Sequence, residues 1–212
     1  MTKPVEAPRV ALCVPAAGAG ARMGGPKALQ PLDGRSFVEH ILATMRDAGV
    51  APRYVVGRDA APALRAACAR GGARLLVNPD PDRGMLSSIH VCLDAIGREE
   101  AAERAPTGMA TIDALFVAPV DCPRVRAATV ATLVAAFART GASIVVPRFG
   151  ERRGHPTLFA RALFAELRAA PLDVGARAVV RAHAPDRVEV SVDDPAVLDD
   201  FDRPAPDDRA SR

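Results

Sequence analysis

The chain has 212 residues with a formal net charge of +3, and 49% of them are hydrophobic, which suits one large domain with a substantial core. Aromatic residues make up only 4% and the basic residues form no stripe, so the composition argues against nucleic acid as a partner. No apolar run approaches the ~18 residues of a membrane span, and residues 1–8 lack the apolar stretch of a signal peptide, so we expect a cytoplasmic protein without a membrane partner.

Predicted strands and helices alternate along the chain. Apolar, β-branched runs predict strands at residues 10–14, 54–56, 74–77, 113–118, 143–147 and 188–192. Helices are predicted over about 37–48 and 62–70, around 89–96, up to about 140, around 163–167 and after 173. This alternation is typical of parallel strands with helices on both faces of the sheet. We expect residues 1–8 to be flexible, 9–202 to form a single domain and 203–212, rich in Pro, Asp and Arg, to be disordered.

A glycine-rich basic loop follows the first strand, which we expect to end at Pro15. Residues 15–27 read Pro-Ala-Ala-Gly-Ala-Gly-Ala-Arg-Met-Gly-Gly-Pro-Lys, with glycines at 18, 20, 24 and 25 and positive charges at Arg22 and Lys27. Exposed backbone amides and two cations are suited to hold a polyphosphate. The dinucleotide fingerprint would need glycine at Met23, and Pro26 displaces the lysine of a P-loop. A plain glycine-rich turn remains the alternative.

Serines mark two of the helix starts. Ser36 and Glu39 have the spacing of a capping box. Further along, the prolines of residues 78–84 forbid a continuing strand, and Ser87 or Ser88 is expected to cap the helix that follows. The loop before these serines therefore leaves the edge of the sheet.

Carboxylates follow two of the later strands. In open α/β sheets the ligand lies beyond the carboxyl ends of the strands, where Asp121 and the pair Asp193 and Asp194 are expected. Carboxylates beside phosphate-binding cations imply Mg²⁺, which is held by one or two carboxylates together with phosphate oxygens. Each aspartate could instead cap a helix start. Cys122 has no evident base beside it, and we interpret it as structural.

The loop at residues 15–27, followed by Leu-Gln-Pro-Leu at 29–32, resembles the signature of MobA-like nucleotidyltransferases related to molybdenum cofactor guanylyl- and cytidylyltransferases. The cytidylyltransferase branch is resembled more narrowly at residues 78–79, 84–85, 87–89, 153–156, 158–159, 173–177 and 192–195. The resemblance covers roughly residues 9–201. It implies a three-layer, Rossmann-like α/β nucleotidyltransferase fold with a mostly parallel mixed sheet.

The resemblance also implies an activity, in which the phosphate of an acceptor attacks the α-phosphorus of a nucleoside triphosphate and pyrophosphate leaves. It implies CTP as donor, the molybdopterin cofactor as acceptor and Mg²⁺ as cofactor. The implied catalytic residues are Arg22, Lys27 and Asp121, and the implied metal ligands are Asp121 and either Asp193 or Asp194, with Asp193 preferred. The implied nucleotide-binding residues are Ala16, Ala17, Gly18, Gly20, Arg22, Lys27, Asn78, Gly84, Ser87 and Ser88. Those facing the acceptor are Gly154, His155, Pro156 and Asp173.

Two other functions remain open on the sequence. A sugar-1-phosphate or related nucleotidylyltransferase would use the same triphosphate loop with another acceptor. A nucleotide- or cofactor-binding protein without catalysis would not need Lys27, Asp121 and Asp193 together. We expect a monomer or a weak homo-oligomer.

Overall fold

A central mixed sheet organises the computed structural model, which describes residues 7–18, 25–103 and 111–201. Its strands run in the order β10-β7-β9-β6-β1-β4-β5, with β8 paired to β7. They are β1 Val10–Ala16, β4 Arg53–Gly57, β5 Arg74–Val77, β6 Ala114–Val117, β7 Ile144–Phe149, β8 Arg152–Arg153, β9 Thr157–Ala160 and β10 Arg187–Ser191. A separate two-stranded hairpin joins β2 Pro31–Leu32 to β3 Arg35–Ser36.

Most of the strand pairs are parallel. β1 pairs in parallel with β4 and β6, β4 with β5, and β7 with β10, whereas β9 runs antiparallel to both β6 and β7. Because β9 is antiparallel to both of its neighbours, β6 and β7 run in the same direction, and β7 and β10 are therefore parallel to β1 and β6. The carboxyl ends of these strands therefore share one edge of the sheet, which is where α/β proteins bind ligands.

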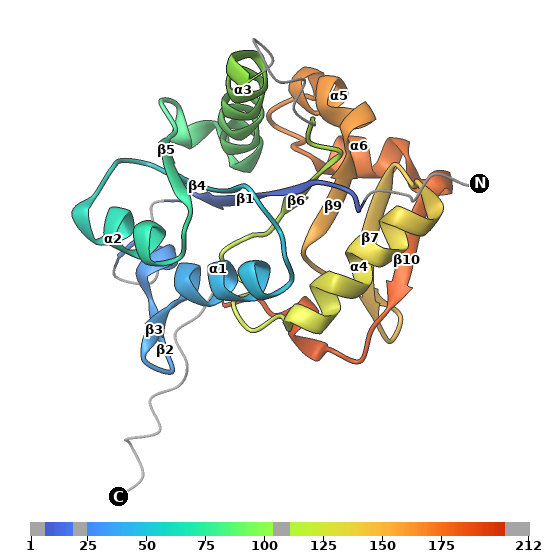
Figure 1. Ribbon diagram of the computed structural model, residues 1–212, viewed down its shortest axis with the longest axis horizontal. Coiled ribbons are helices and arrows are strands. Elements are labelled where there is room, and N and C mark those ends of the chain that lie inside the picture. Colours follow the sequence, from blue (N-terminus) through green and yellow to red (C-terminus); the bar gives the residue numbers. More distant parts are fainter. Residues whose placement is uncertain (1–6, 19–24, 104–110, 202–212) are drawn as a thin grey trace, which may run out of the picture.

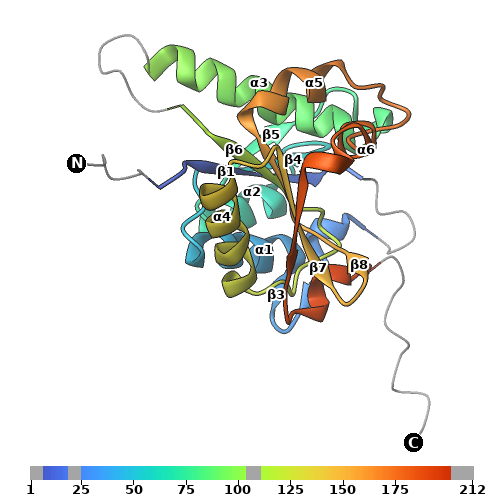
Figure 2. The same ribbon diagram turned by 90° about the vertical axis from the view of Figure 1, so that its right-hand side faces the viewer.

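Helices cover both faces of the sheet (Figures 1 and 2). α1 Phe37–Asp47, α2 Pro62–Arg70 and α4 Ala127–Thr140 pack on one face, and α3 Met85–Glu103, α5 Phe164–Ala169 and α6 Arg177–Ala182 on the other. Short 3₁₀ helices are η2 Lys27–Leu29, η3 Pro81–Arg83, η4 Arg161–Leu163, η5 Ala184–Asp186 and η6 Pro195–Leu198. The three-layer α/β fold with a mostly parallel mixed sheet is thereby confirmed. Within the described ranges, no helix combines the length and apolarity needed to cross a membrane.

The two core layers follow from alternation along buried strands. In β1, Leu12 and Val14 face the layer of α1, α2 and α4, while Ala11 and Cys13 face that of α3. All of β1 is buried because β4 and β6 flank it and helices cover both of its faces. The start of α1 is the predicted capping box, in which Glu39 Oε2 accepts hydrogen bonds from Ser36 N at 2.9 Å and Ser36 Oγ at 2.5 Å. These bonds, the hydroxyl's first, lower the pKa of Glu39 to about 2.

β1 differs from the prediction because it continues through Pro15 to Ala16. Cys13 O accepts a hydrogen bond from Ala118 N on the β6 side at 3.0 Å, and residues two apart in a strand face the same neighbour. The nitrogen of Pro15 therefore faces the side on which β6 has already ended, at Val117 opposite Cys13. A proline needs no donor there, so this central strand tolerates it.

The start of α3 also differs from the prediction. This helix begins at Met85, so Ser87 and Ser88 lie inside its first turn and do not cap it. Gly84, just before the helix, has a φ of +83°, a conformation that favours glycine. The glycine thus makes the turn into the helix that we assigned to a serine cap.

Candidate functional site

An ion pair between Lys27 and Asp121 lies at the carboxyl edge of the sheet. Lys27 opens η2 after the glycine-rich loop, and Asp121 lies in the turn that follows β6. The Lys27 Nζ is 2.6 Å from Asp121 Oδ1, and the two side chains are 14% and 31% exposed. Oδ1 is buried and accepts no hydrogen bond of regular geometry from the described residues. The ammonium therefore balances a carboxylate oxygen that has little access to water.

The described part of the glycine-rich loop exposes its backbone. Ala16 and Ala17 are buried, whereas Gly18 is exposed and a Cβ built there would meet nothing within 4 Å. A ligand can therefore approach the backbone at Gly18 without meeting a side chain. The predicted phosphate contacts Gly20 and Arg22 lie outside the described residues.

The predicted nucleotide-binding residues after β5 form a buried polar network. Asn78 is 2% exposed, and its Nδ2 donates to Ser87 Oγ at 2.8 Å and to Ser88 Oγ at 3.0 Å. Asn78 Oδ1 accepts from Asp80 N at 2.9 Å, and Ser87 Oγ donates to Gly84 O at 2.7 Å. Both amide hydrogens of Asn78 are thereby used inside the protein. The network fastens residues 78–84 to the first turn of α3.

Residues 171–175 lie beside this network. A Cβ built on Gly84 would be 3.9 Å from Leu172 O, so the segment that carries Asp173 approaches the end of residues 78–84. Asp173 is exposed, as are Met85 at 49% and Val174 at 41%. Exposed large apolar side chains near polar groups are a common feature of ligand sites.

The Gly-His-Pro stretch is held between β7 and η6. Gly154 N donates to Pro147 O at 2.9 Å, and His155 N donates to Val197 O at 2.8 Å. A Cβ on Gly154 would lie only 2.1 Å from Val197 O, so no larger residue fits without a shift of backbone. The close approach to η6 explains the glycine and brings the loop next to the Asp193–Asp194 turn.

His155 lies between opposite charges at this edge. His155 is exposed, and the protein atoms packed around its ring lower its pKa by partial desolvation. The negative charge of Asp121 opposes this shift and the positive charge of Arg177 adds to it. The lowered pKa favours the neutral imidazole, which can donate or accept a hydrogen bond. Arg177 ends the stretch 173–177 that carries part of the resemblance, but no role was predicted for it, because its local pattern does not place it near His155.

The two aspartates after β10 have different roles. Asp194 is buried, and its Oδ2 accepts from Thr129 Oγ1 at 2.6 Å and from Arg126 N at 2.9 Å. Burial raises the pKa of Asp194, but the bonds from Thr129 and Arg126 outweigh it, so the net pKa is lowered. Asp194 thus joins the start of α4 to η6. Asp193 is exposed, and its backbone carbonyl accepts a hydrogen bond from Arg126.

Cys122, next to Asp121, is a buried thiol. Its Sγ donates to Asp199 O at 3.1 Å, and burial raises its pKa to about 12, with Asp121 adding to the shift. A thiol with this pKa supplies almost no thiolate at neutral pH. The geometry agrees with its interpretation as a structural residue.

The carboxylates available to a divalent cation are few. Within the described ranges, no group of three or more His, Cys, Asp or Glu side chains could hold a metal ion. Asp194 is occupied by hydrogen bonds, whereas Asp121 has a buried oxygen balanced by a lysine, and Asp193 carries an exposed carboxylate. This donor set fits Mg²⁺ held partly by substrate phosphates, and does not fit an all-protein metal cage.

Comparison with known proteins identifies a family for most of the chain. A model of the MobA-like NTP transferase domain matches residues 12–188. Among curated relatives, the nicotine blue oxidoreductase of Paenarthrobacter nicotinovorans is 37% identical over 153 residues, which are 66% of each chain. The 2-C-methyl-D-erythritol 4-phosphate cytidylyltransferase of Frankia casuarinae is 34% identical over 128 residues, 56% of this chain and 47% of the relative. The chain thus spans about two thirds and about half of these relatives' lengths.

Solved structures with the same fold include Rv0371c from Mycobacterium tuberculosis H37Rv. It is 26% identical, covers 88% of this chain and 89% of its own, and superposes with a TM-score of 0.70. Rv0371c has also been solved in complex with manganese, and that structure matches with 26% identity, coverage of 87% and 88%, and a TM-score of 0.64.

Proposed function

The chain belongs to the family of MobA-like NTP transferase domains, and on this premise we propose that it moves a nucleoside monophosphate from CTP to a phosphate-bearing acceptor, the molybdopterin cofactor. The observation that carries this proposal is the 2.6 Å pair of Lys27 and Asp121 at the edge where the glycine-rich loop leaves β1. A cation for phosphate and a carboxylate for a metal meet there, as transfer from a triphosphate requires.

In the proposed reaction, an oxygen of the acceptor's phosphate attacks the α-phosphorus of the triphosphate. A phosphorus–oxygen bond forms as the bond to the bridging oxygen breaks, and pyrophosphate leaves with the electron pair. Lys27, Arg22 and the amides of Gly18 and Gly20 would hold the triphosphate and offset the charge that develops on it. Mg²⁺, held by Asp121 and Asp193, would neutralise further phosphate charge.

Two groups of residues would position the substrates. Ala16 and Ala17 would lie beneath the nucleotide, and the network of Asn78, Ser87 and Ser88 would hold residues 78–84 in shape for the base and ribose. Gly154, His155, Pro156 and Asp173 would face the acceptor. His155, whose lowered pKa favours the neutral imidazole, would offer a hydrogen bond to the acceptor.

The experiment is a panel of CTP, GTP, UTP and ATP with Mg²⁺, each with molybdenum cofactor or a sugar phosphate, scored by pyrophosphate release. We expect release with CTP that depends on the cofactor. Lys27→Ala and Asp121→Ala should each lose this release while keeping the circular dichroism of the wild type. Arg46→Ala is the matched control, because its guanidinium pairs with exposed Asp47 on α1. Near-normal turnover in either site variant would overturn the assignment.

Two competing functions have distinct outcomes in the same panel. Release with a sugar phosphate in place of the cofactor would assign the chain to metabolite activation. The relative named as an oxidoreductase favours redox chemistry as a second candidate. That activity would consume a reduced nicotinamide or flavin and release no pyrophosphate, and the mismatch at Met23 with the dinucleotide fingerprint argues against it.

A further inference from the structure

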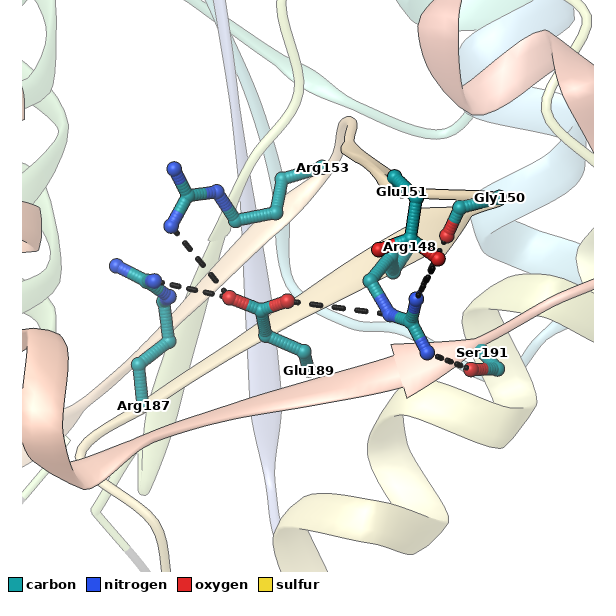
Figure 3. A network of polar contacts seen from close by, with 7 residues as sticks. All are labelled: Arg148, Gly150, Glu151, Arg153, Arg187, Glu189 and Ser191. Carbon is teal, nitrogen blue, oxygen red and sulfur yellow. Dashed lines mark hydrogen bonds and ion pairs between the residues drawn. The ribbon is translucent and has the colours of Figure 1, made fainter.

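Three arginines surround one glutamate on the outer part of the sheet. We define the arginine cluster as Arg148, Arg153 and Arg187 around Glu189 (Figure 3). The Glu189 Oε1 is 2.9 Å from Arg187 Nη2 and 3.4 Å from Arg153 Nη1, and its Oε2 is 3.9 Å from Arg148 Nε. Arg153 and Arg187 thus approach the same carboxylate oxygen, from the same side of Glu189 in Figure 3.

The arginine cluster has more positive than negative charge. Three guanidinium groups face the single carboxylate of Glu189, which is 32% exposed, and the other nearby acid, Glu151, is 98% exposed, so water screens its charge. Arg187 is only 9% exposed, and its buried Nε makes no hydrogen bond with the described residues. Two like charges on one oxygen repel each other, and a second anion would relieve that repulsion.

The strand register places the arginine cluster on one face of the sheet. Arg148 of β7 pairs directly with Arg153 of β8, so both side chains leave the hairpin on the same side. Arg187 and Glu189 are two residues apart on β10, so both face the side of α6. There, Arg187 Nη1 donates to Val180 O at 3.4 Å. Val188 and Val190 pack on the opposite face. The cluster is therefore a feature of the face that α6 partly covers.

The arginine cluster also lies at the edge of the candidate site. Arg148 is near the carboxyl end of β7, and β7 is parallel to β6, the strand that leads to Asp121. Arg153 directly precedes Gly154, which begins the stretch proposed to face the acceptor. Figure 2 shows the β7–β8 hairpin on the same side of the molecule as the end of β1.

We propose that the arginine cluster binds a separate oxyanion, a phosphate or carboxylate, at the edge of the candidate site. The molybdopterin cofactor carries one phosphate, the one that reacts, so this anion is not a group of that acceptor and the inference goes beyond the proposed function. Arg187, with the shortest contact, keeps Glu189 in place. Arg148 donates from Nη1 to Gly150 O at 2.7 Å and from Nη2 to Ser191 Oγ at 2.8 Å, whereas Arg153 lies 3.4 Å from Glu189 and retains donors for a ligand. The planar fork of an arginine matches the geometry of a phosphate or carboxylate.

The test uses inorganic phosphate as the probe and follows the side-chain Nε–H signals of the arginines by NMR. Arg153→Gln should weaken phosphate binding about tenfold, the effect of losing one charge-assisted hydrogen bond. Arg152→Gln is the matched control: it removes the same charge from the same strand, but Arg152 pairs with Phe149 and faces the other side. It should change the affinity less than about twofold, as a screened surface charge does. An equal loss of phosphate affinity in both variants would indicate general electrostatic attraction to a positive surface, not binding by the cluster, and would overturn the proposal.

Glu189→Gln gives a second, opposite result. It keeps an oxygen that can accept from Arg187 and removes the charge that opposes an anion, so phosphate should bind several-fold more tightly. A purely structural network predicts lower stability with unchanged phosphate binding, which would overturn the proposal.

A final arm separates the cluster from the triphosphate site. Saturating CTP with Mg²⁺ should leave phosphate binding at the arginine cluster unchanged, and displacement by CTP would assign the anion to the nucleotide and refute a separate anion site. If the proposed function fails, CTP neither binds nor turns over while phosphate still perturbs Arg153 and Arg187. If only this inference fails, turnover with CTP persists and the arginine signals do not respond.

Discussion

The pair of Lys27 and Asp121 predicts that one substitution has opposite effects on two ligands of the same site. In Lys27→Met the ammonium 2.6 Å from Asp121 Oδ1 is lost, and the carboxylate loses the cation paired with it. A divalent cation then binds this oxygen more easily, whereas a triphosphate loses a positive charge that would hold it. We expect tighter binding of Mn²⁺ alone and weaker binding of CTP.

The magnitude follows from the exposure of the two side chains, 14% for Lys27 and 31% for Asp121. An exposed ion pair contributes about 0–1 kcal/mol, and loss of one partner from a buried pair costs about 3–5 kcal/mol. This half-buried pair lies between them, at roughly 1.5–2 kcal/mol. Because 1.4 kcal/mol is a factor of about ten in affinity, Lys27→Met should bind Mn²⁺ about ten- to thirtyfold more tightly. The variant should also lose about 1–2 kcal/mol of unfolding free energy, since the carboxylate is left unpaired.

The assay is a titration of Mn²⁺ into nucleotide-free protein, followed by electron paramagnetic resonance, with a parallel calorimetric titration of CTP. The double variant Lys27→Met/Asp121→Asn is the control, since it removes the carboxylate on which the gain depends. Urea unfolding of each variant verifies that the folds remain comparable. The reasoning is wrong if Lys27→Met binds Mn²⁺ no better than the wild type, or if the double variant keeps the gain.

Three other predictions concern protonation and packing. Because the pKa of Asp194 is lower in the folded state than its ordinary value of 3.8, its charge stabilises the fold fully above pH 3.8, and this stability is lost as the pH falls through the folded-state pKa. Thr129→Val removes one of the bonds that lower this pKa, so it should cost about 1–3 kcal/mol in urea unfolding at pH 7 and less at pH 2. Glu39, with a pKa of about 2, likewise contributes stability that is lost as the pH falls from 4.5 to 2. Ser36→Ala removes the hydroxyl that lowers this pKa most, so an NMR titration should show the pKa of Glu39 raised toward 4.5. Cys122, with a pKa of about 12, should react with iodoacetamide at pH 7.5 only when the protein is denatured, and rapid labelling of the native protein would contradict its burial.

The architecture was predictable because its signals are local and strong. Apolar runs of three to six residues indicated the main strands, and the capping box at Ser36 set the start of α1. The hairpin of β7 and β8 was not predicted, because Arg152 and Arg153 lack the apolar alternation of a strand. Continuation of β1 through Pro15 depends on where β6 ends, which only the tertiary structure decides.

The site was predictable in part, because ligands of α/β proteins bind at the carboxyl ends of the parallel strands. The sequence placed Lys27 and Asp121 at the same edge, and the structure brings them into contact. It could not separate Asp193 from Asp194, because both precede a proline turn and only packing shows that Asp194 faces Thr129. For the same reason no role was predicted for Arg177, although it ends the stretch 173–177, because its charge acts on His155, which is distant in the sequence. Arg187 was not predicted as a site residue either, because its contact with Glu189 gains importance only once β7 and β8 bring further arginines beside it.

The Asn78 network shows why residue type alone overstates direct contact with a ligand. Asn78 and Ser87 are polar and adjacent to the expected nucleotide. However, Asn78 donates both amide hydrogens to serine hydroxyls, and Ser87 donates its own to Gly84 O. A buried group that already has its hydrogen bonds gains little by exchanging them for ligand bonds. We infer that these side chains hold the shape of residues 78–84, so that backbone groups of that segment would read the base. Selectivity among nucleotides would then respond to substitutions that move this segment, such as Gly84→Ala at its φ of +83°, more than to loss of one hydroxyl.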